Sequence, residues 1–86
     1  MAILQVTSHL KNIAPKHPAS VEGRTLHEVL EKLFAQYPLL RGYILDDRGL
    51  IRKHIAIFIE GERISNLNCP LSENTKVYVL QALSGG

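Results

Sequence analysis

The hydrophobic pattern of residues 25–37 predicts an amphipathic helix. Its apolar residues recur at the three- and four-residue intervals that place side chains on one helix face: Leu26, Val29, Leu30, Leu33 and Phe34. Thr25 and Glu28 have the spacing of a capping box, in which the Thr25 hydroxyl accepts a hydrogen bond from the Glu28 amide and the Glu28 carboxylate reaches back to the Thr25 amide. Pro38 follows, and a residue before proline avoids the helical region. We therefore expect one helix from Thr25 to Tyr37.

The chain before this helix has the alternation that is typical of strands. Leu4 and Val6 lie on one side of an N-terminal strand, and Gln5 lies on the other. A short apolar segment over 19–23 ends at a glycine and follows a loop that contains two prolines. The two segments predict a hairpin with a long, irregular turn.

Three segments after the helix also have strand patterns. Residues 54–60 are apolar on both sides, with isoleucines on one side and Phe58 on the other, so this strand lies at or near the centre of a sheet. After a turn at Gly61-Glu62, a short return strand begins at Arg63. The last strand covers 76–83, where valines alternate with other side chains.

The order strand, strand, helix, strand, short strand, strand predicts the fold class. A hairpin followed by one main helix and further strands makes an α+β sheet with that helix across one face. A β-grasp (ubiquitin-like) mixed sheet satisfies this order, with the first and last strands as parallel neighbours in the middle. We expect residues 1–83 to form a single β-grasp domain and residues 84–86 to form a flexible C-terminal tail.

Composition limits the classes of function. The 86 residues are 45% hydrophobic and 21% charged, which is typical of one globular domain and not of a disordered chain. A net charge of +2 from scattered lysines and arginines gives no basic patch, so we expect no nucleic-acid partner. No apolar run reaches the roughly 18–20 residues of a membrane span, and no signal peptide is apparent, so we expect no membrane association. The one cysteine, Cys69, cannot form an internal disulfide, which fits a cytoplasmic protein.

Short motifs through nearly the whole chain carry a resemblance to a known family. They are Thr25-Leu-His-Glu-Val-Leu-Glu-Lys-Leu33, Tyr37-Pro-Leu-Leu-Arg41, Asp46-Asp-Arg-Gly49, Ile57-Phe-Ile-Glu-Gly-Glu62, Pro70-Leu-Ser-Glu-Asn-Thr-Lys-Val77 and Leu80-Gln-Ala-Leu-Ser-Gly-Gly86. With these motifs the chain resembles the ubiquitin-like sulfur carrier (MoaD/ThiS) family, which includes the small subunit of molybdopterin synthase and the thiamine sulfur carrier. The sequence departs from many relatives at Gln81, where they have proline, and near Glu60, where they have asparagine.

The resemblance implies a role for the C-terminal glycine. In such carriers an ATP-dependent E1-like enzyme adenylates the terminal carboxylate, here that of Gly86, and the adenylate is converted to a thiocarboxylate that donates sulfur in a biosynthetic pathway. The chain would then be a carrier and not an enzyme, or the small subunit of a molybdopterin synthase-type complex. It would bind no cofactor itself, because the activating partner holds the ATP and the Mg²⁺. A sulfur donor and a sulfur-accepting enzyme for molybdopterin, cysteine, thiamine or another thiolated metabolite complete the implied partners.

The tail residues suit this role. Gly85 and Gly86 have no β-carbon, so the backbone can pass through a narrow channel in a partner enzyme. Ser84 to Gly86 span about 10 Å when fully extended, at roughly 3.3–3.6 Å per residue. We expect Gly86 to carry the reacting carboxylate, and Gly85 and Ser84 to be required for its access.

A second candidate site lies on the sheet. One face must cover the helix, and apolar residues on the other face would form a patch for a partner. We single out Phe58 and Leu80 as partner-binding residues, with an ordinary core position as the alternative for each. Leu80 stands where the small subunit of molybdopterin synthase, in the resemblance, uses an aromatic side chain against its partners. A basic rim could come from charged residues that are otherwise simply solvated: Arg41, Arg52, Lys53 and Arg63.

Nothing else in the sequence predicts an autonomous enzyme or a metal site. The histidines share no ligand spacing, Cys69 has no adjacent basic residue to activate it, and no serine lies in a Gly-x-Ser-x-Gly motif. Two alternatives to the sulfur carrier stay open. One is a ubiquitin-like protein modifier that is conjugated through Gly86 to lysines, and the other is a β-grasp interaction module with an inert tail.

Overall fold

The computed structural model describes residues 1–6 and 18–81. In chain order its elements are β1 (Ala2–Val6), β2 (Ala19–Val21), α1 (Leu26–Gln36), α2 (Pro38–Ile44), β3 (Ile55–Ile59), β4 (Glu62–Ile64) and β5 (Lys76–Gln81). The predicted strands are all present, and α2 is an addition to the one main helix that was predicted. The domain boundary at 83 and the tail at 84–86 stay predictions, since they lie outside the described residues.

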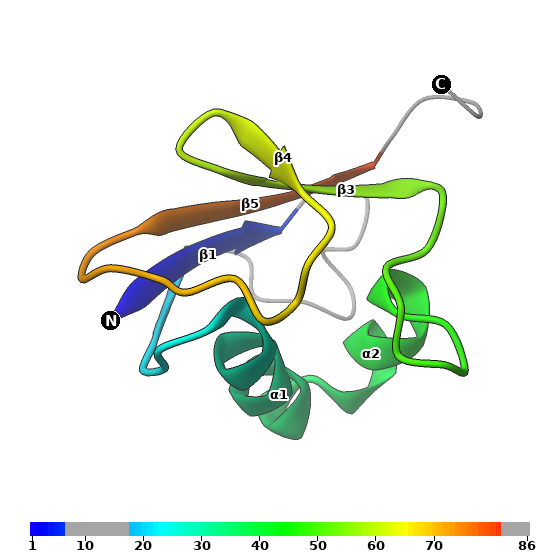
Figure 1. The fold of residues 1–86 in the computed structure, drawn as a ribbon. Helices are drawn as coiled ribbons and strands as arrows, with labels where there is room; N and C mark the ends of the chain where they lie inside the picture. Colours follow the sequence, from blue (N-terminus) through cyan, green and yellow to red (C-terminus); the bar gives the residue numbers. More distant parts are fainter. Residues whose placement is uncertain (7–17, 82–86) are drawn as a thin grey trace.

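The five strands form one mixed sheet in the order β2-β1-β5-β3-β4. β1 and β5 run parallel, and the other three neighbouring pairs run antiparallel. Both helices lie on the same side of this sheet (Figure 1). The first and last strands are therefore adjacent in the middle, with the helices across one face, which confirms the predicted β-grasp arrangement.

The core lies between the sheet and the helices. All five residues that were predicted for the buried face of α1 are buried. They form one cluster with alternate residues of the strands and with two residues of α2, among which the large, fully buried side chains are Leu4, Leu40, Ile44, Ile57, Val77 and Val79. The period-2 pattern of the strands and the helical period of α1 thus meet in a single hydrophobic layer.

The N-terminus of α1 has the predicted threonine cap. Thr25 Oγ1 accepts a hydrogen bond from the Glu28 backbone N at 3.2 Å, which satisfies an amide that no helical carbonyl can reach. The Glu28 side chain makes a different hydrogen bond from the one that the capping box predicts. The Glu28 carboxylate accepts a 3.5 Å hydrogen bond from the Thr25 hydroxyl instead of one from the Thr25 amide.

A loop from a distant part of the chain completes this cap. The Leu26 amide donates to the Cys69 carbonyl at 3.0 Å, and the His27 amide donates to the Leu67 carbonyl at 2.7 Å. Two more of the free amides of α1 are therefore satisfied by residues of the loop between β4 and β5. This loop joins β4 to β5, so it ties the start of α1 to the strands at the far end of the sequence.

The second helix, α2, begins directly after α1 ends at Gln36. Pro38 ends the first helix, as predicted, but it also occupies the first position of α2, where a missing amide costs nothing and the fixed φ favours the helix. Leu40 and Ile44 are buried, so this short helix extends the core beside α1. The sequence does not predict this helix because seven residues hold too few turns to show a helical period.

The turn that was predicted at Asp46-Asp-Arg-Gly49 is present and is organised by one carboxylate. Asp46 Oδ1 accepts hydrogen bonds from the backbone N of Arg48 at 2.8 Å and from that of Leu50 at 3.0 Å. The Leu50 bond lowers the pKa of the Asp46 carboxyl most; the Arg48 bond and the Arg52 charge lower it further, against an opposing effect of desolvation. Asp46 is therefore a turn residue, and its Oδ1 accepts hydrogen bonds from two backbone amides of the turn.

Replacing Leu30 by alanine tests the register of α1. Leu30 is 1% exposed, so the substitution leaves a cavity and should lower the free energy of unfolding by about 2–5 kcal/mol. Urea denaturation of the two proteins measures the difference. Gln36→Ala, at an exposed position of the same helix, is the control and should change stability by less than about 0.5 kcal/mol. Equal stability of Leu30→Ala and wild type would contradict this packing.

Candidate functional site

One face of the sheet is not covered by either helix, and we call it the free face. Val77 and Val79 of β5 are buried against the helices, so alternation turns Lys76, Tyr78 and Leu80 to the opposite side. The neighbouring strands contribute the residues that pair with these. The residues on the free face therefore follow from the strand registers.

The strand registers bring an apolar patch together on the free face. Tyr78 is paired with Phe58 of β3 on one side and with Gln5 of β1 on the other. Leu80 is two residues along β5 and is paired with Ala56, so it is a diagonal neighbour of Phe58. We call Phe58, Tyr78 and Leu80 the apolar patch.

The two predicted residues of this patch differ in exposure. Leu80 is 41% exposed, whereas Phe58 is half-buried. Neither belongs to the core between the sheet and the helices, so the alternative reading of both as ordinary core residues is not supported by the structure. The structure places them where a partner can reach them. Their binding of a partner stays a prediction.

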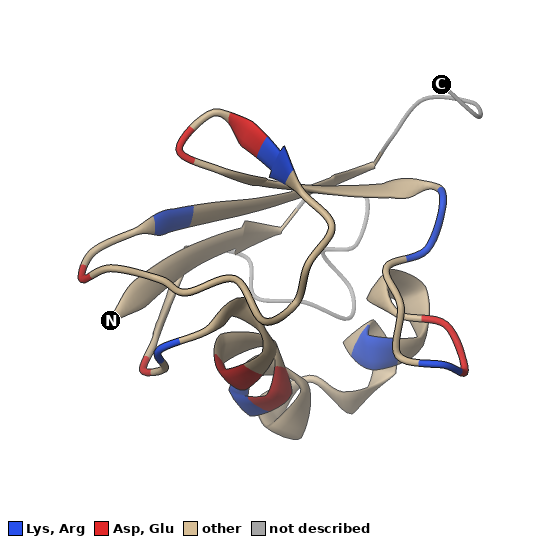
Figure 2. Ribbon diagram, in the orientation of Figure 1, with Lys and Arg blue, Asp and Glu red and all other residues tan. Residues whose placement is uncertain are grey.

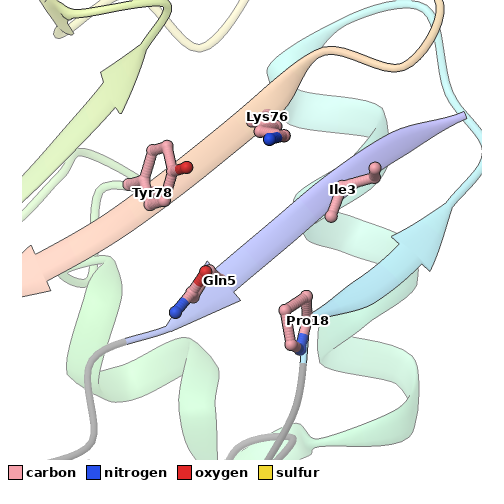
Figure 3. A pocket seen from close by; sticks show the side chains of 5 residues that line it. All are labelled: Ile3, Gln5, Pro18, Lys76 and Tyr78. Atoms are coloured by element: carbon pink, nitrogen blue, oxygen red, sulfur yellow. The ribbon is translucent and has the colours of Figure 1, made fainter.

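A shallow hollow of about 140 Å³ lies beside the patch, between β1 and β5. In Figure 3, which looks onto the free face with the helices behind the sheet, Lys76 and Tyr78 extend from β5 and Ile3 and Gln5 extend from β1. Pro18, just before β2, closes the third side. The hollow is large enough for one side chain of a partner, with an aliphatic and an aromatic wall and the Lys76 ammonium at its edge.

The charged side chains that the described strands place on the free face are cationic. Lys76 lies on β5, and Arg63 on β4 is paired with Phe58, so both lie next to the apolar patch (Figure 2). Of the four residues considered for a basic rim, only Arg63 is on this face. Arg41 lies among the helices, where its Nη1 is 2.8 Å from Glu31 Oε1.

The tail residues of the predicted site lie outside the described residues. These are Ser84, Gly85 and Gly86, and the last described residue is Gln81 at the end of β5. Gln81 is paired with Ile55, the first residue of β3. The last described residue therefore lies at the end of a central strand, one residue after Leu80 of the apolar patch.

The remaining candidates of the sequence show no reactive arrangement within residues 1–6 and 18–81. No group of three or more His, Cys, Asp or Glu side chains there could hold a metal ion. Cys69 is half-buried, and its carbonyl serves the cap of α1. His27 and His54 are exposed, and the other two histidines lie outside the described residues. No helix in the same residues is long and apolar enough to cross a membrane.

Sequence reasoning missed Tyr78 and Lys76 as site residues. Both lie an even number of residues from Leu80 along β5, so they share its side of the sheet. The prediction that Leu80 lies on the free face therefore already placed them there. The hollow between β1 and β5 was not visible in the sequence. Its walls come from the two ends of the chain, and only the parallel pairing brings them together.

A match to a family model shows which protein family the chain belongs to. The model of the ThiS family matches residues 4–86, which is nearly the whole chain. The chain belongs to the ThiS family. It is therefore a ubiquitin-like protein of the sulfur carrier and modifier type, a small carrier and not a catalyst. The resemblance seen in the sequence motifs is confirmed by this match.

Solved structures with the same fold support the assignment of the architecture. A chain of the Amycolatopsis orientalis BexX/CysO complex has 12% identity and a TM-score of 0.87, with 100% of both chains covered. Mycobacterium tuberculosis CysO has 19% identity and a TM-score of 0.87, with 96% of this chain and 100% of that chain covered. SAMP1 from Haloferax volcanii has 22% identity and a TM-score of 0.77, with 99% and 98% covered. At these identities the likeness shows the β-grasp fold. A comparison with curated proteins gives no match.

Replacing Leu80 by aspartate tests the assignment of the two faces in this ThiS-family chain. The new carboxylate stays in water on the free face, so thermal stability should remain close to that of wild type. Val79→Asp is the matched control, because Val79 is fully buried and a charge there cannot be solvated; it should abolish folding. Circular dichroism melts compare the three proteins. Equal damage from both substitutions would show that Leu80 belongs to the core.

Proposed function

We propose that this protein is a sulfur carrier whose C-terminal carboxylate, on Gly86, is adenylated by an ATP-dependent E1-like enzyme and then converted to a thiocarboxylate. The observation that carries the proposal is the family match, which runs through the Gly85-Gly86 pair to the end of the sequence. The exposed apolar patch on the strand that leads to the tail supports it. The carrier would act in the cytoplasm, where ATP is available.

The proposed chemistry has two steps. A carboxylate oxygen of Gly86 attacks the α-phosphorus of ATP, the bond to the β-phosphate breaks, and pyrophosphate leaves. The product is an acyl-adenylate, in which AMP is a good leaving group. A sulfur nucleophile at the oxidation level of sulfide then attacks the carbonyl carbon and displaces AMP, so a thiocarboxylate forms without a change in the number of electrons. The enzyme would hold ATP and Mg²⁺, and the ion would offset the phosphate charge.

In this proposal the chain supplies the surface by which the activating enzyme binds it. The apolar patch offers Phe58 and Leu80, with Tyr78 between them, to the surface of the activating enzyme. Burial of such surface contributes about 25 cal/mol per Å² of apolar area removed from water. Because Leu80 lies near the end of β5, the strand that precedes residues 84–86 in the sequence, binding through the patch would bring this end of the domain to the same enzyme.

A sulfur-accepting enzyme is the second partner in this proposal. The receiving pathway is that of molybdopterin, cysteine, thiamine or another thiolated metabolite, and the fold is compatible with each of these. One of the similar solved structures is a complex, that of BexX with CysO, and it shows a protein of this fold bound to another protein. We propose the same general mode for this chain, in which the carrier domain is held by the enzyme that uses its tail.

Conjugation to proteins is a second candidate function. Three of the similar structures are of SAMP1, a small archaeal modifier protein. A modifier shares the adenylation of Gly86, but a lysine amine and not a sulfur nucleophile displaces the activated leaving group. The two functions therefore differ in the acceptor and agree in the activation step.

Activation is tested by ATP–pyrophosphate exchange with an E1-like enzyme of the same organism. Wild type should support exchange, and deletion of Gly86 should reduce it to background. The deletion moves the last carbonyl back by roughly 3.3–3.6 Å, and a displacement of about 1 Å in a positioned reaction can cost about 100-fold. A protein with one residue added after Gly86 should fail in the same way, because its Gly86 has a peptide bond and no free carboxylate.

The patch is tested in the same assay with Leu80→Asp. This variant should raise the KM for the carrier, because the enzyme surface must desolvate the new charge. Exchange by the Gly86 deletion at the wild-type rate would show that the tail is not the reacting group. The chain would then be a β-grasp interaction module. Exchange by Leu80→Asp with an unchanged KM would remove Leu80 from the site.

A further inference from the structure

A second exposed apolar surface lies on the helical side of the molecule, away from the free face. Leu39 and Tyr43 are four residues apart on α2, so they share one face of this helix, and they are 69% and 52% exposed. Together with Gly42, Arg52 and His54 they line an open depression of about 380 Å³, which we call the α2 notch. Large apolar side chains with this exposure are typical of interaction sites.

The edge of the α2 notch is cationic and held in place. Arg52 Nε donates a 2.7 Å hydrogen bond to the carbonyl of Gly42, and the Arg52 backbone N donates to the carbonyl of Ile44 at 2.9 Å. These two bonds fix the arginine against α2, and the residue is partly exposed. Lys53 and His54 follow it and are both exposed. The segment that leads into β3 is basic and lies beside α2 (Figure 2).

The acidic residues near the notch have other partners. Asp46 accepts hydrogen bonds from two backbone amides of its own turn. Glu31 Oε1 forms a salt bridge with Arg41 Nη1 at 2.8 Å. Arg52 and Lys53 place two cations at the edge of the notch; the Arg52 charge also acts on Asp46, and the exposed Lys53 attracts carboxylates from a partner.

The notch lies at the end of the sheet from which the tail leaves. His54 directly precedes Ile55, which is paired with Gln81, the last described residue before the tail. An enzyme that draws the tail into its active site must come close to this end of the sheet. The notch is thus within reach of the partner that performs the proposed activation.

We propose that the α2 notch binds an acidic segment of the E1-like activating enzyme, one that presents a large apolar side chain beside carboxylates. This inference rests on the proposed function. The apolar side chain packs on Leu39 and Tyr43 over the bare backbone of Gly42, and the carboxylates meet Arg52 and Lys53. A second copy of this chain fits less well, because a symmetric contact would bring the same cations together. A nucleic acid fits less well because the net charge of +2 provides no broad basic surface around the notch.

Gly42 allows a direct test of the notch. A β-carbon at this position meets no other atom within 4 Å, so a side chain there extends into open space. Gly42→Glu fills the notch and places a carboxylate beside Arg52, whereas Gly42→Ala adds one methyl group and favours the helix. Lys53→Glu, at an exposed position, is a second variant that reverses a charge at the edge without changing α2.

The assay is ATP–pyrophosphate exchange with the full chain and the activating enzyme, with the carrier concentration varied. Gly42→Glu and Lys53→Glu should each raise the KM for the carrier by about tenfold or more with kcat unchanged, and Gly42→Ala should match wild type. Thermal melts should show that all four proteins are folded. Added salt should raise the KM of wild type more than that of Lys53→Glu, because it screens the contact that this variant has lost.

The outcomes separate this inference from the proposed function. Exchange by wild type with unchanged KM values for both charge variants would overturn the α2 notch and leave the carrier function intact. Failure of wild type to exchange would overturn both. A concentration-dependent dimer of wild type in sedimentation, dissociated by Gly42→Glu, would assign the notch to a second copy of this chain and would also overturn the proposal.

Discussion

The parallel pairing of β1 with β5 is the contact on which the rest of the structure depends. Parallel neighbours cannot be joined by a tight turn, so everything between them, two helices and three strands, serves as the connection. The pairing buries Leu4 beside Val77 in the layer that α1 covers. It also makes the last strand a central one. The last described residue, Gln81, therefore lies in the middle of the sheet and not on an edge strand.

That placement links the fold to the proposed carrier function. A tail on a central strand is flanked by the side chains of both neighbouring strands, so a partner that takes the tail also meets a broad surface. Leu80 and Tyr78 lie on that surface because Val79 and Val77 are needed in the core, and alternation leaves no other choice. The stability of the domain and the exposure of its binding residues thus come from the same strand.

Much of this could be predicted from the sequence, because the signals were local. The period of α1, the Thr25 cap and the order of the strands needed no distant contact. The missing parts are those that depend on tertiary structure. α2 was missed because Pro38 ends one helix and begins another, and Phe58 could not be assigned to a face because β3 is apolar on both sides. The α2 notch joins residues 39–43 to 52–54, and only the folded chain brings them together.

The central claim is that Gly86 carries sulfur, and the intact mass of the protein from its native host tests it most directly. The account predicts a population whose chain ends at Gly86 and whose mass is higher by the difference between one sulfur and one oxygen atom. Fragmentation should place that difference on the C-terminal residue, and an alkylating reagent should convert the thiocarboxylate to a thioester. A protein with an unmodified carboxylate in every preparation, or one found only as conjugates to lysines of other proteins, would contradict the claim.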